Sequence, residues 1–344
     1  MRGMFPKTPF LGLTATGTGK VIDDVHQVLN VSSTAVVFRD SFNRPNLIYE
    51  VVRKPSAQKD CVAMIKDLLQ KDFKDESGII YTFSIKDAEE IAESLNQSNL
   101  KVGVYHANLD PKIRSSVHSA WVNNKIRVIV ATIAFGMGID KPDVRFVIHH
   151  SLSKSIENYY QESGRAGRDG KRARCILMHR FGDDFRVASM VCGERTGITN
   201  LKNIMAYAVE LSRCRRQILA QYFEAEWNST DCDKACDNCL APTKAKEVDV
   251  TALLLKLYQI FDETAAKDQK LTDERIVSMR SCIISDSHFL LDEHAGLKLV
   301  EALGKAKSLS PEYCERVITS LLLEGYLKMD FHYTPYNVVV YVLP

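Results

Sequence analysis

The sequence has little of what marks a membrane-bound, secreted or strongly charged protein. No apolar run reaches the roughly 18 residues that a membrane-spanning helix needs. Residues 1–10 lack the apolar core of a signal peptide. Lysine and arginine number 45 against 43 acidic residues, a formal net charge of +2, so any contact with nucleic acid must come from local patches. The 344 residues contain no internal repeat or low-complexity segment and suffice for about two or three domains.

The sequence also lacks the two motifs that hold a nucleoside triphosphate in P-loop enzymes. There is no G-x-x-x-x-G-K-[S/T] and no Asp-Glu-x-His. Gly19-Lys20 resembles the end of a P-loop, but Thr14 stands where that motif needs glycine and Val21 where it needs serine or threonine. We therefore expect that this chain alone does not cradle the β- and γ-phosphates of a nucleotide.

Cysteine is present in an odd number, nine, without a secretory signal, which predicts a reducing compartment. Four of the cysteines follow the spacing C-x17-C-x3-C-x2-C, and three of these lie within eight polar residues. Buried structural thiols or a redox pair are the alternatives, but so polar a stretch does not form a core. The spacing predicts a structural Zn²⁺ held by four thiolates, namely Cys214, Cys232, Cys236 and Cys239. The other five lie in apolar contexts and are expected to be inert: Cys61, Cys175, Cys192, Cys282 and Cys314.

Short apolar strands alternate with helices through the first half of the chain. Such alternation predicts an α/β fold with a parallel sheet and right-handed crossovers, whose functional groups gather at the carboxyl ends of the strands. We expect strands at 10–13, 36–39, 78–83, 102–105, 126–131, 145–149 and 175–178. We expect helices at 21–29, 61–69, 86–96 (capped by Ser84), 111–122 and 155–164.

An arginine-containing stretch, residues 161–170, is the strongest candidate for chemistry. If this run is helical, the spacing places Gln161, Arg165 and Arg168 on one face. Arginine makes planar, forked contacts with phosphate oxygens, and arginine fingers of nucleoside triphosphatases use it in this way. A solvated basic helix end is the alternative. Gly164 and Gly167 favour the functional interpretation, because they leave space beside each arginine.

A second candidate, residues 132–140, follows an expected strand about 25 residues upstream of the arginines. Gly136 and Gly138 allow close approach of a ligand to the backbone. Thr132 offers a hydroxyl to a phosphate, and Asp140 offers a carboxylate to a ribose hydroxyl or an arginine. At the end of another strand, His106 is as readily a surface imidazole as a functional group.

After His179 the expected helices lengthen and the strand–helix alternation stops. Residues 201–223 are expected to form a helical pair, residues 241–247 a polar linker, and residues 248–261, 271–280 and 311–324 three helices. Two strands, 326–331 and 337–342, then flank a turn with exposed tyrosines. Three helices and a terminal hairpin predict a winged helix. Tyr333 and Tyr336 could stack on bases or, alternatively, pair across the hairpin.

Taken together, these motifs resemble the RecQ family of DNA helicases over nearly the whole chain. The resemblance rests on residues 12–16, 41–47, 105–109, 131–145 and 161–170 and on the four cysteines. It implies a RecA-like lobe followed by a helical zinc-binding subdomain and a winged helix. It also implies 3′-to-5′ ATP-dependent DNA unwinding, a nuclear location, and a role in DNA repair and recombination.

The resemblance assigns roles to the candidate residues. Gln161, Arg165 and Arg168 would reach the nucleotide as catalytic groups, and the cofactor-binding residues would be Asn43, Arg44, Gly136, Gly138 and Asp140. Contacts with DNA would come from Thr14, Thr16, His106, Thr132, Tyr333 and Tyr336. Thr14 to Thr16 would couple the nucleotide site to DNA, and Tyr336, with Tyr333 as second choice, would separate the duplex.

The implied domains are a remnant of a first RecA-like lobe with a linker (1–48), a second lobe (49–200), the zinc subdomain (201–243) and the winged helix (244–344). Zn²⁺ would be structural, whereas ATP and Mg²⁺ would bind only with the first lobe, which we expect to be nearly all missing. The expected partner is forked or junction DNA, not a membrane, and self-association is left open. Two interpretations remain: a fragment or truncated isoform of a helicase, and a DNA-binding module without ATPase activity.

Overall fold

The computed structural model describes residues 4–5, 7–14, 16–31, 35–136, 139–242, 251–266, 270–272 and 311–344. The chain divides into two compact units, one made of Met1–His179 and Glu210–Lys244, the other of Arg180–Val209 and Ala245–Pro344. Within the described ranges, no helix is long and apolar enough to cross a membrane.

The first unit is built on a six-stranded sheet in which every neighbouring pair is parallel, as predicted. The order along the sheet is β1-β6-β5-β2-β4-β3. The strands are β1 (Leu47–Arg53), β2 (Ser77–Tyr81), β3 (Val102–Tyr105), β4 (Val128–Ala131), β5 (Val144–His149) and β6 (Ala173–His179). β2 and β4 are buried along their whole length, because the continuous apolar runs of a parallel sheet are covered on both faces.

Two strand predictions were wrong, and one strand was missed. Residues 10–13 and 36–39 lie outside any sheet in the structure, and their side chains Leu11 and Phe38 are 85% and 93% exposed. β1 instead begins at Leu47 and pairs with β6. Strand propensity alone was misleading at these two places, since a strand forms only where a neighbour completes its hydrogen bonds.

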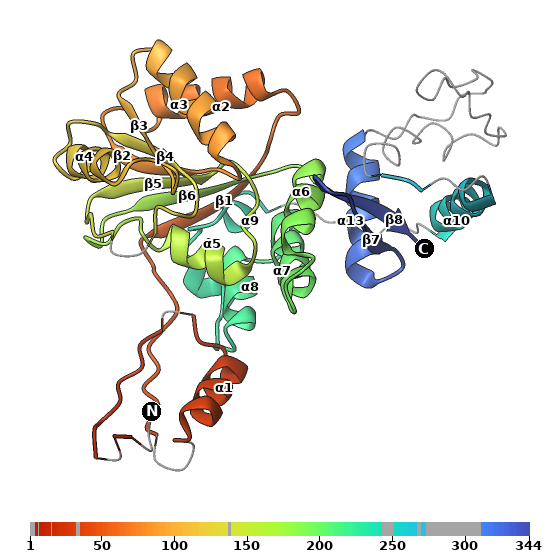
Figure 1. Ribbon diagram of the computed structural model, residues 1–344, viewed down its shortest axis with the longest axis horizontal. Helices are drawn as coiled ribbons and strands as arrows, with labels where there is room; N and C mark the ends of the chain where they lie inside the picture. Colours follow the sequence, from red (N-terminus) through yellow and green to blue (C-terminus); the bar gives the residue numbers. More distant parts are fainter. Residues whose placement is uncertain are drawn as a thin grey trace. The chain divides into compact units, whose positions relative to one another are not determined.

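The helices of the first unit follow their capping signals. They are α1 (Gly19–Leu29), α2 (Gln58–Lys71), α3 (Ile85–Gln97), α4 (Pro111–Val122) and α5 (Ile156–Ser163). Ser84 caps α3 by accepting a hydrogen bond from the Asp87 amide, as predicted, and Asp110 and Ser155 do the same for α4 and α5. Figure 1 shows α2 and α3 on one side of the sheet and α5 on the other. Ile65 and Ile91 of α2 and α3 pack with Ile80 and Phe146 in one core.

The zinc region closes one edge of the sheet. It contains α8 (Arg215–Tyr222), a single 3₁₀ turn at Ser229–Cys232 and the short α9 (Asp237–Leu240). The Tyr49 amide donates to the Ala235 carbonyl, and the Val51 amide donates to the Asp237 carboxylate. The outer edge of β1 is therefore paired rather than left open.

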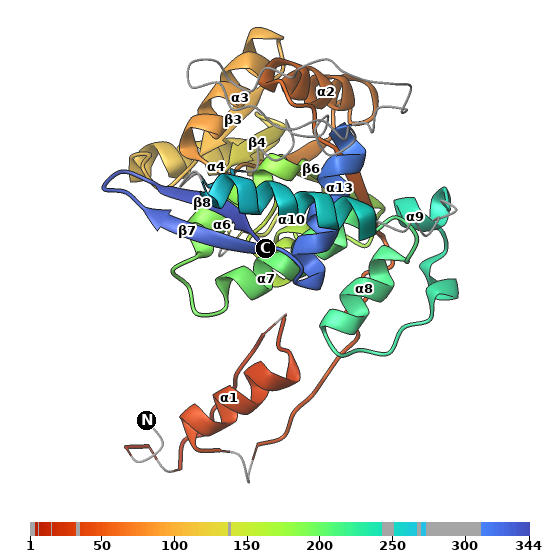
Figure 2. The same ribbon diagram turned by 90° about the vertical axis from the view of Figure 1, so that its right-hand side faces the viewer.

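The second unit comprises α6 (Phe181–Val191), α7 (Gly197–Val209), α10 (Thr251–Ala266) and α13 (Pro311–Glu324), together with a hairpin of β7 (Lys328–Tyr333) and β8 (Val338–Leu343). The two strands lie side by side in Figure 2, antiparallel and in register from Lys328↔Leu343 to Tyr333↔Val338. The helix expected at 271–280 falls almost entirely outside the described residues. The winged helix therefore stays a prediction supported by two helices and the hairpin.

Candidate nucleotide site and zinc centre

The arginine stretch lies in a turn that follows α5. The helix ends at Ser163, with Gly164 as its C-cap, and residues 164–169 form turns. The run is therefore not helical at the two arginines, and the shared helical face that the spacing allowed does not form. Gly167 explains the tight path, because its φ of +56° lies in the left-handed region that favours glycine.

The turn nevertheless brings each polar side chain to another residue that the sequence had singled out. Arg165 donates to the Gly136 carbonyl at 2.5 Å. Arg168 donates to the Asp140 carboxylate at 2.9 Å and to the backbone carbonyl before it at 3.0 Å. The Gln161 amide donates to the Thr16 hydroxyl at 2.9 Å. Two stretches separated by about 25 residues and the threonine motif near the start of the chain thus meet at one place.

The two arginines differ in availability. The side chain of Arg168 is 37% exposed, and its partner Asp140 is 80% exposed, so this ion pair faces solvent. Arg165 is half-buried, and its Nε atom is buried without a hydrogen-bond partner. An exposed ion pair contributes little to stability. Arg168 is therefore the guanidinium that can turn towards a ligand at low cost, whereas Arg165 holds the loop at Gly136.

A supporting layer beneath the arginines was not predicted from the sequence. The Tyr81 hydroxyl, at the end of β2, donates to the Phe135 carbonyl at 2.7 Å. Burial raises the pKa of Tyr81 well above its ordinary value, so the hydroxyl stays protonated and remains a donor. Its ring stacks on His149, which bonds Glu162 at 2.8 Å. Position at the carboxyl end of a strand was the one sequence signal that pointed to Tyr81.

The segment at 43–47 lies against the arginine turn. The Arg44 guanidinium donates to three carbonyls of that turn, those of Gly164, Ala166 and Gly167. Asn43 accepts a hydrogen bond from Arg216. Their assignment to nucleotide binding stays a prediction, since in this structure both side chains are occupied by the protein.

The residues expected to contact DNA differ in how far they are exposed to solvent. Thr14 is exposed and Thr132 is half-buried at the end of β4. His106 is buried and lies 3.2 Å from Glu89, so it is not at the surface as a DNA contact would need. Gly138 lies outside the described residues. In the second unit, Tyr336 at the hairpin tip is 98% exposed. Tyr333 is 63% exposed, and its hydroxyl lies 3.4 Å from the Cys192 sulfur.

The four predicted cysteines converge. Their Sγ atoms all lie within 4.8 Å of one another, and those of Cys214 and Cys236 are 4.0 Å apart. Four thiolates about 2.3 Å from a tetrahedral Zn²⁺ lie about 3.8 Å apart, so the set fits zinc. Cys232 is also buried and Cys239 is half-buried, as a closed structural site requires.

The backbone conformation at this site and the lowered pKa of one thiol both favour metal binding. Asp233 and Lys234 both adopt positive φ, which turns the chain sharply between the second and third cysteines. A hydrogen bond from the Cys236 thiol lowers the pKa of Cys214 to about 4, whereas burial raises the pKa of Cys232 to about 12. Hydrogen bonding thus favours the thiolate form of Cys214, and zinc binding must displace the protons of the thiols that still carry them.

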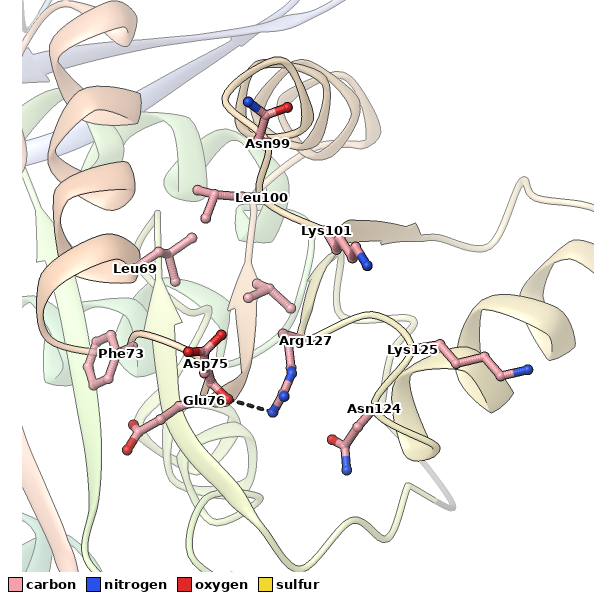
Figure 3. Close-up of a pocket in the computed structure, with 11 residues that line it drawn as sticks. Leu69, Phe73, Asp75, Glu76, Asn99, Leu100, Lys101, Asn124, Lys125 and Arg127 are labelled. Atoms are coloured by element: carbon pink, nitrogen blue, oxygen red, sulfur yellow. Dashed lines mark hydrogen bonds between the residues drawn. The ribbon is translucent and has the colours of Figure 1, made fainter.

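One cavity lies away from these side chains. It has a volume of about 340 Å³ and lies at the amino ends of β2, β3 and β4. Figure 3 shows Lys101, Lys125 and Arg127 around it, with Arg127 bonded to the Asp75 carbonyl. No predicted site residue lines this cavity. The arginine turn lies beside the amino end of β5, where the Gly167 amide donates to the Val144 carbonyl and the Asp169 amide donates to the Pro142 carbonyl.

Comparison with known proteins gives two family matches. Residues 60–170 match the helicase conserved C-terminal domain, and residues 181–240 match the RecQ zinc-binding domain. The ATP-dependent DNA helicase Q1 of Mus musculus is 43% identical over 342 residues, which cover 99% of this chain and 51% of the mouse protein. The ATP-dependent DNA helicase Q-like 2 of Arabidopsis thaliana is 41% identical over 343 residues, covering 99% of this chain and 46% of the plant protein.

Among solved structures, S. cerevisiae Dbp5 bound to RNA and ADP BeF3 aligns with a TM-score of 0.44 at 18% identity. The alignment covers 57% of this chain and 48% of the Dbp5 chain. The chain spans about half the length of the curated relatives that it matches.

Proposed function

Because the chain belongs to the RecQ family of DNA helicases, we propose that it forms the second lobe, the zinc subdomain and the strand-separating part of a 3′-to-5′ ATP-dependent DNA helicase. The observation that carries the proposal is the meeting of Gln161, Arg165 and Arg168 with Thr16, Gly136 and Asp140. In such an enzyme, ATP bound at a first lobe would supply the phosphoryl group that is transferred to water, and Mg²⁺ would neutralise its charge.

The residues of this chain would act on that reaction by positioning and by charge. Arg168 would leave Asp140 and turn to the phosphates, where a guanidinium stabilises the charge that develops in the transition state. Arg165 and Tyr81 would keep the loop at residues 135–136 fixed during that movement. Gln161, through its bond to Thr16, would connect nucleotide occupancy to the threonine motif.

We also propose the domain limits 1–48, 49–200, 201–243 and 244–344, with forked DNA as the partner and the nucleus as the location. Tyr336 is our choice for the residue that separates the strands, because it is almost fully exposed at the hairpin tip. Tyr333 is less free, since its hydroxyl is near Cys192.

A second candidate function is a DNA-binding module without ATPase activity. It is favoured by the absence of G-x-x-x-x-G-K-[S/T] and Asp-Glu-x-His from the sequence. ATP hydrolysis by purified residues 1–344 with single-stranded DNA separates the two. Turnover above about 1 s⁻¹, the low end of ordinary enzyme rates, excludes the inactive module. No turnover alone, but turnover once a first lobe is joined to the chain, supports the helicase.

A further inference from the structure

Arg216 is a buried arginine that holds the segment at 43–47. Its side chain is 2% exposed and lies 5.4 Å over the Tyr49 ring. One terminal nitrogen donates to the Asn43 side chain and, at 2.9 Å, to the Arg44 carbonyl. The other donates to the carbonyls of Pro45, at 3.3 Å, and Leu47. A buried charge with this many acceptors is costly to replace, because removing it leaves four oxygens without their donors.

The same short segment holds the arginine turn from its other side. Arg44 donates to the Gly164, Ala166 and Gly167 carbonyls at 3.3, 3.2 and 2.8 Å. Asn46 donates to the Gly167 and Lys171 carbonyls at 2.7 and 2.8 Å. The fit is tight, since a Cβ on Gly167 would lie 2.4 Å from the Asn46 amide nitrogen. The turn therefore depends on where the backbone of 43–47 is held.

Arg216 is itself fixed by the zinc site. It lies in the first turn of α8, two residues after the ligand Cys214. Its neighbour Arg215 makes a forked ion pair with Asp237, at 2.9 and 3.1 Å, next to the ligand Cys236. Four coordinated thiolates would lock this end of α8, whereas free thiols leave it held by hydrogen bonds alone.

We propose that Arg216 is a positioning residue that transmits the state of the zinc site to the arginine turn, through Arg44 and Asn46. This inference rests on the proposed function in one respect: the proposed function is what gives the arginine turn a role at the nucleotide. The physical link, from Cys214 to Arg216 to residues 43–47 to residues 164–171, holds whether or not the arginines touch ATP. Loss of zinc would then loosen Arg165 and Arg168 without any direct contact between zinc and nucleotide.

Amide hydrogen exchange on the zinc-loaded 344-residue chain tests the link. The reporter is the peptide 164–173, which contains the Ala173 amide bonded to the Asn46 carbonyl. Removing zinc from the wild-type chain should speed its exchange about tenfold or more, because exchange reports local opening. Arg216→Ala should give the same acceleration with one zinc still bound, and chelation should add little more. Arg216→Lys, which is more conservative, should show a smaller acceleration.

Controls separate this link from general loosening. Arg215→Ala should speed amide exchange at residues 235–240. Exchange of peptide 164–173 should be slower in Arg215→Ala than in Arg216→Ala. Millimolar methylguanidinium should restore protection of that peptide in Arg216→Ala, and the same concentration of urea should not. The inference is overturned if peptide 164–173 is unchanged by chelation and by Arg216→Ala, or if α3 accelerates as much as the turn. The proposed role of the arginines at the nucleotide is tested separately, by the ATP turnover of Arg168→Ala. Normal turnover of that variant would contradict the nucleotide role and leave the exchange result unaffected.

Discussion

Arg168 Nη1 lies 2.9 Å from the Asp140 carboxylate, and both side chains reach solvent. Asp140 belongs to the glycine-containing stretch after β4, and Arg168 to the turn after α5. The pair holds a guanidinium beside the amino end of β5 without burying it. Because exchange of one exposed anion for another costs little, a phosphate can replace Asp140 as the partner of Arg168.

Removal of the Arg168 guanidinium should therefore act on catalysis more than on folding. In a polypeptide that also contains a nucleotide-binding first lobe, we expect Arg168→Ala to reduce DNA-stimulated ATP turnover about 10³-fold or more, as loss of an arginine finger does. The melting temperature should stay nearly constant. Steady-state ATP hydrolysis and thermal denaturation measure the two effects.

Arg172→Ala is the matched control for that variant, because Arg172 is an exposed arginine in the same part of the chain. It should keep normal turnover. If Arg168→Ala also keeps near-normal turnover, the pair with Asp140 is only a surface ion pair and the finger assignment is wrong.

Arg165→Ala should reduce ATP turnover by a similar factor, but it should also lower the stability of the protein. Arg165 is half-buried and bonded to the Gly136 carbonyl, so its loss frees the loop as well as removing a charge. We expect a lower melting temperature and faster amide exchange at 132–136, neither of which Arg168→Ala should produce. Equal stability of the two variants would contradict the division of roles between these arginines.

The sequence was informative where spacing alone determines the geometry. Alternating strands and helices predicted the parallel sheet, and four short-spaced thiols predicted the cluster that the structure brings within 4.8 Å. The sequence was not informative about burial of charge. Nothing in the basic stretch around Cys214 predicted that Arg215 and Arg216 are buried, yet both are 2% exposed. Their acceptors lie far along the chain, at Asp237 and at residues 43–47, and only the fold brings them close.

Removal of zinc should unfold a local region first. Chelation, or Cys214→Ser, should release one zinc per chain and expose residues 210–240, because metal binding supplies much of the folding free energy of such sites. The edge of β1 should lose its pairing with Ala235 at the same time. Cys192→Ala, which removes a thiol outside the cluster, should leave zinc content unchanged. Retained helical content and DNA affinity in strong chelator would rule out a structural zinc.

Binding to forked DNA should weaken steeply with salt. The chain has a net charge of only +2, so attraction must come from a few local contacts between cations and phosphates. Each phosphate contact on duplex DNA contributes about −0.9 to the slope of log K against log salt concentration. Three or more contacts predict a slope of about −3 or steeper in a titration by fluorescence anisotropy. A flat response would argue against DNA as the partner.

The hairpin tip offers a test in which stability and function separate clearly. Tyr336 is 98% exposed, so Tyr336→Ala should change the free energy of unfolding by no more than about 0.5 kcal/mol. If its ring stacks on the first base pair of a fork, the same change should strongly reduce unwinding while ATP turnover on single-stranded DNA stays normal. Tyr333→Ala should have the smaller effect on unwinding, because part of that side chain is engaged with Cys192. A strand-displacement assay on one forked substrate compares both variants, and the opposite ranking would move the wedge to Tyr333.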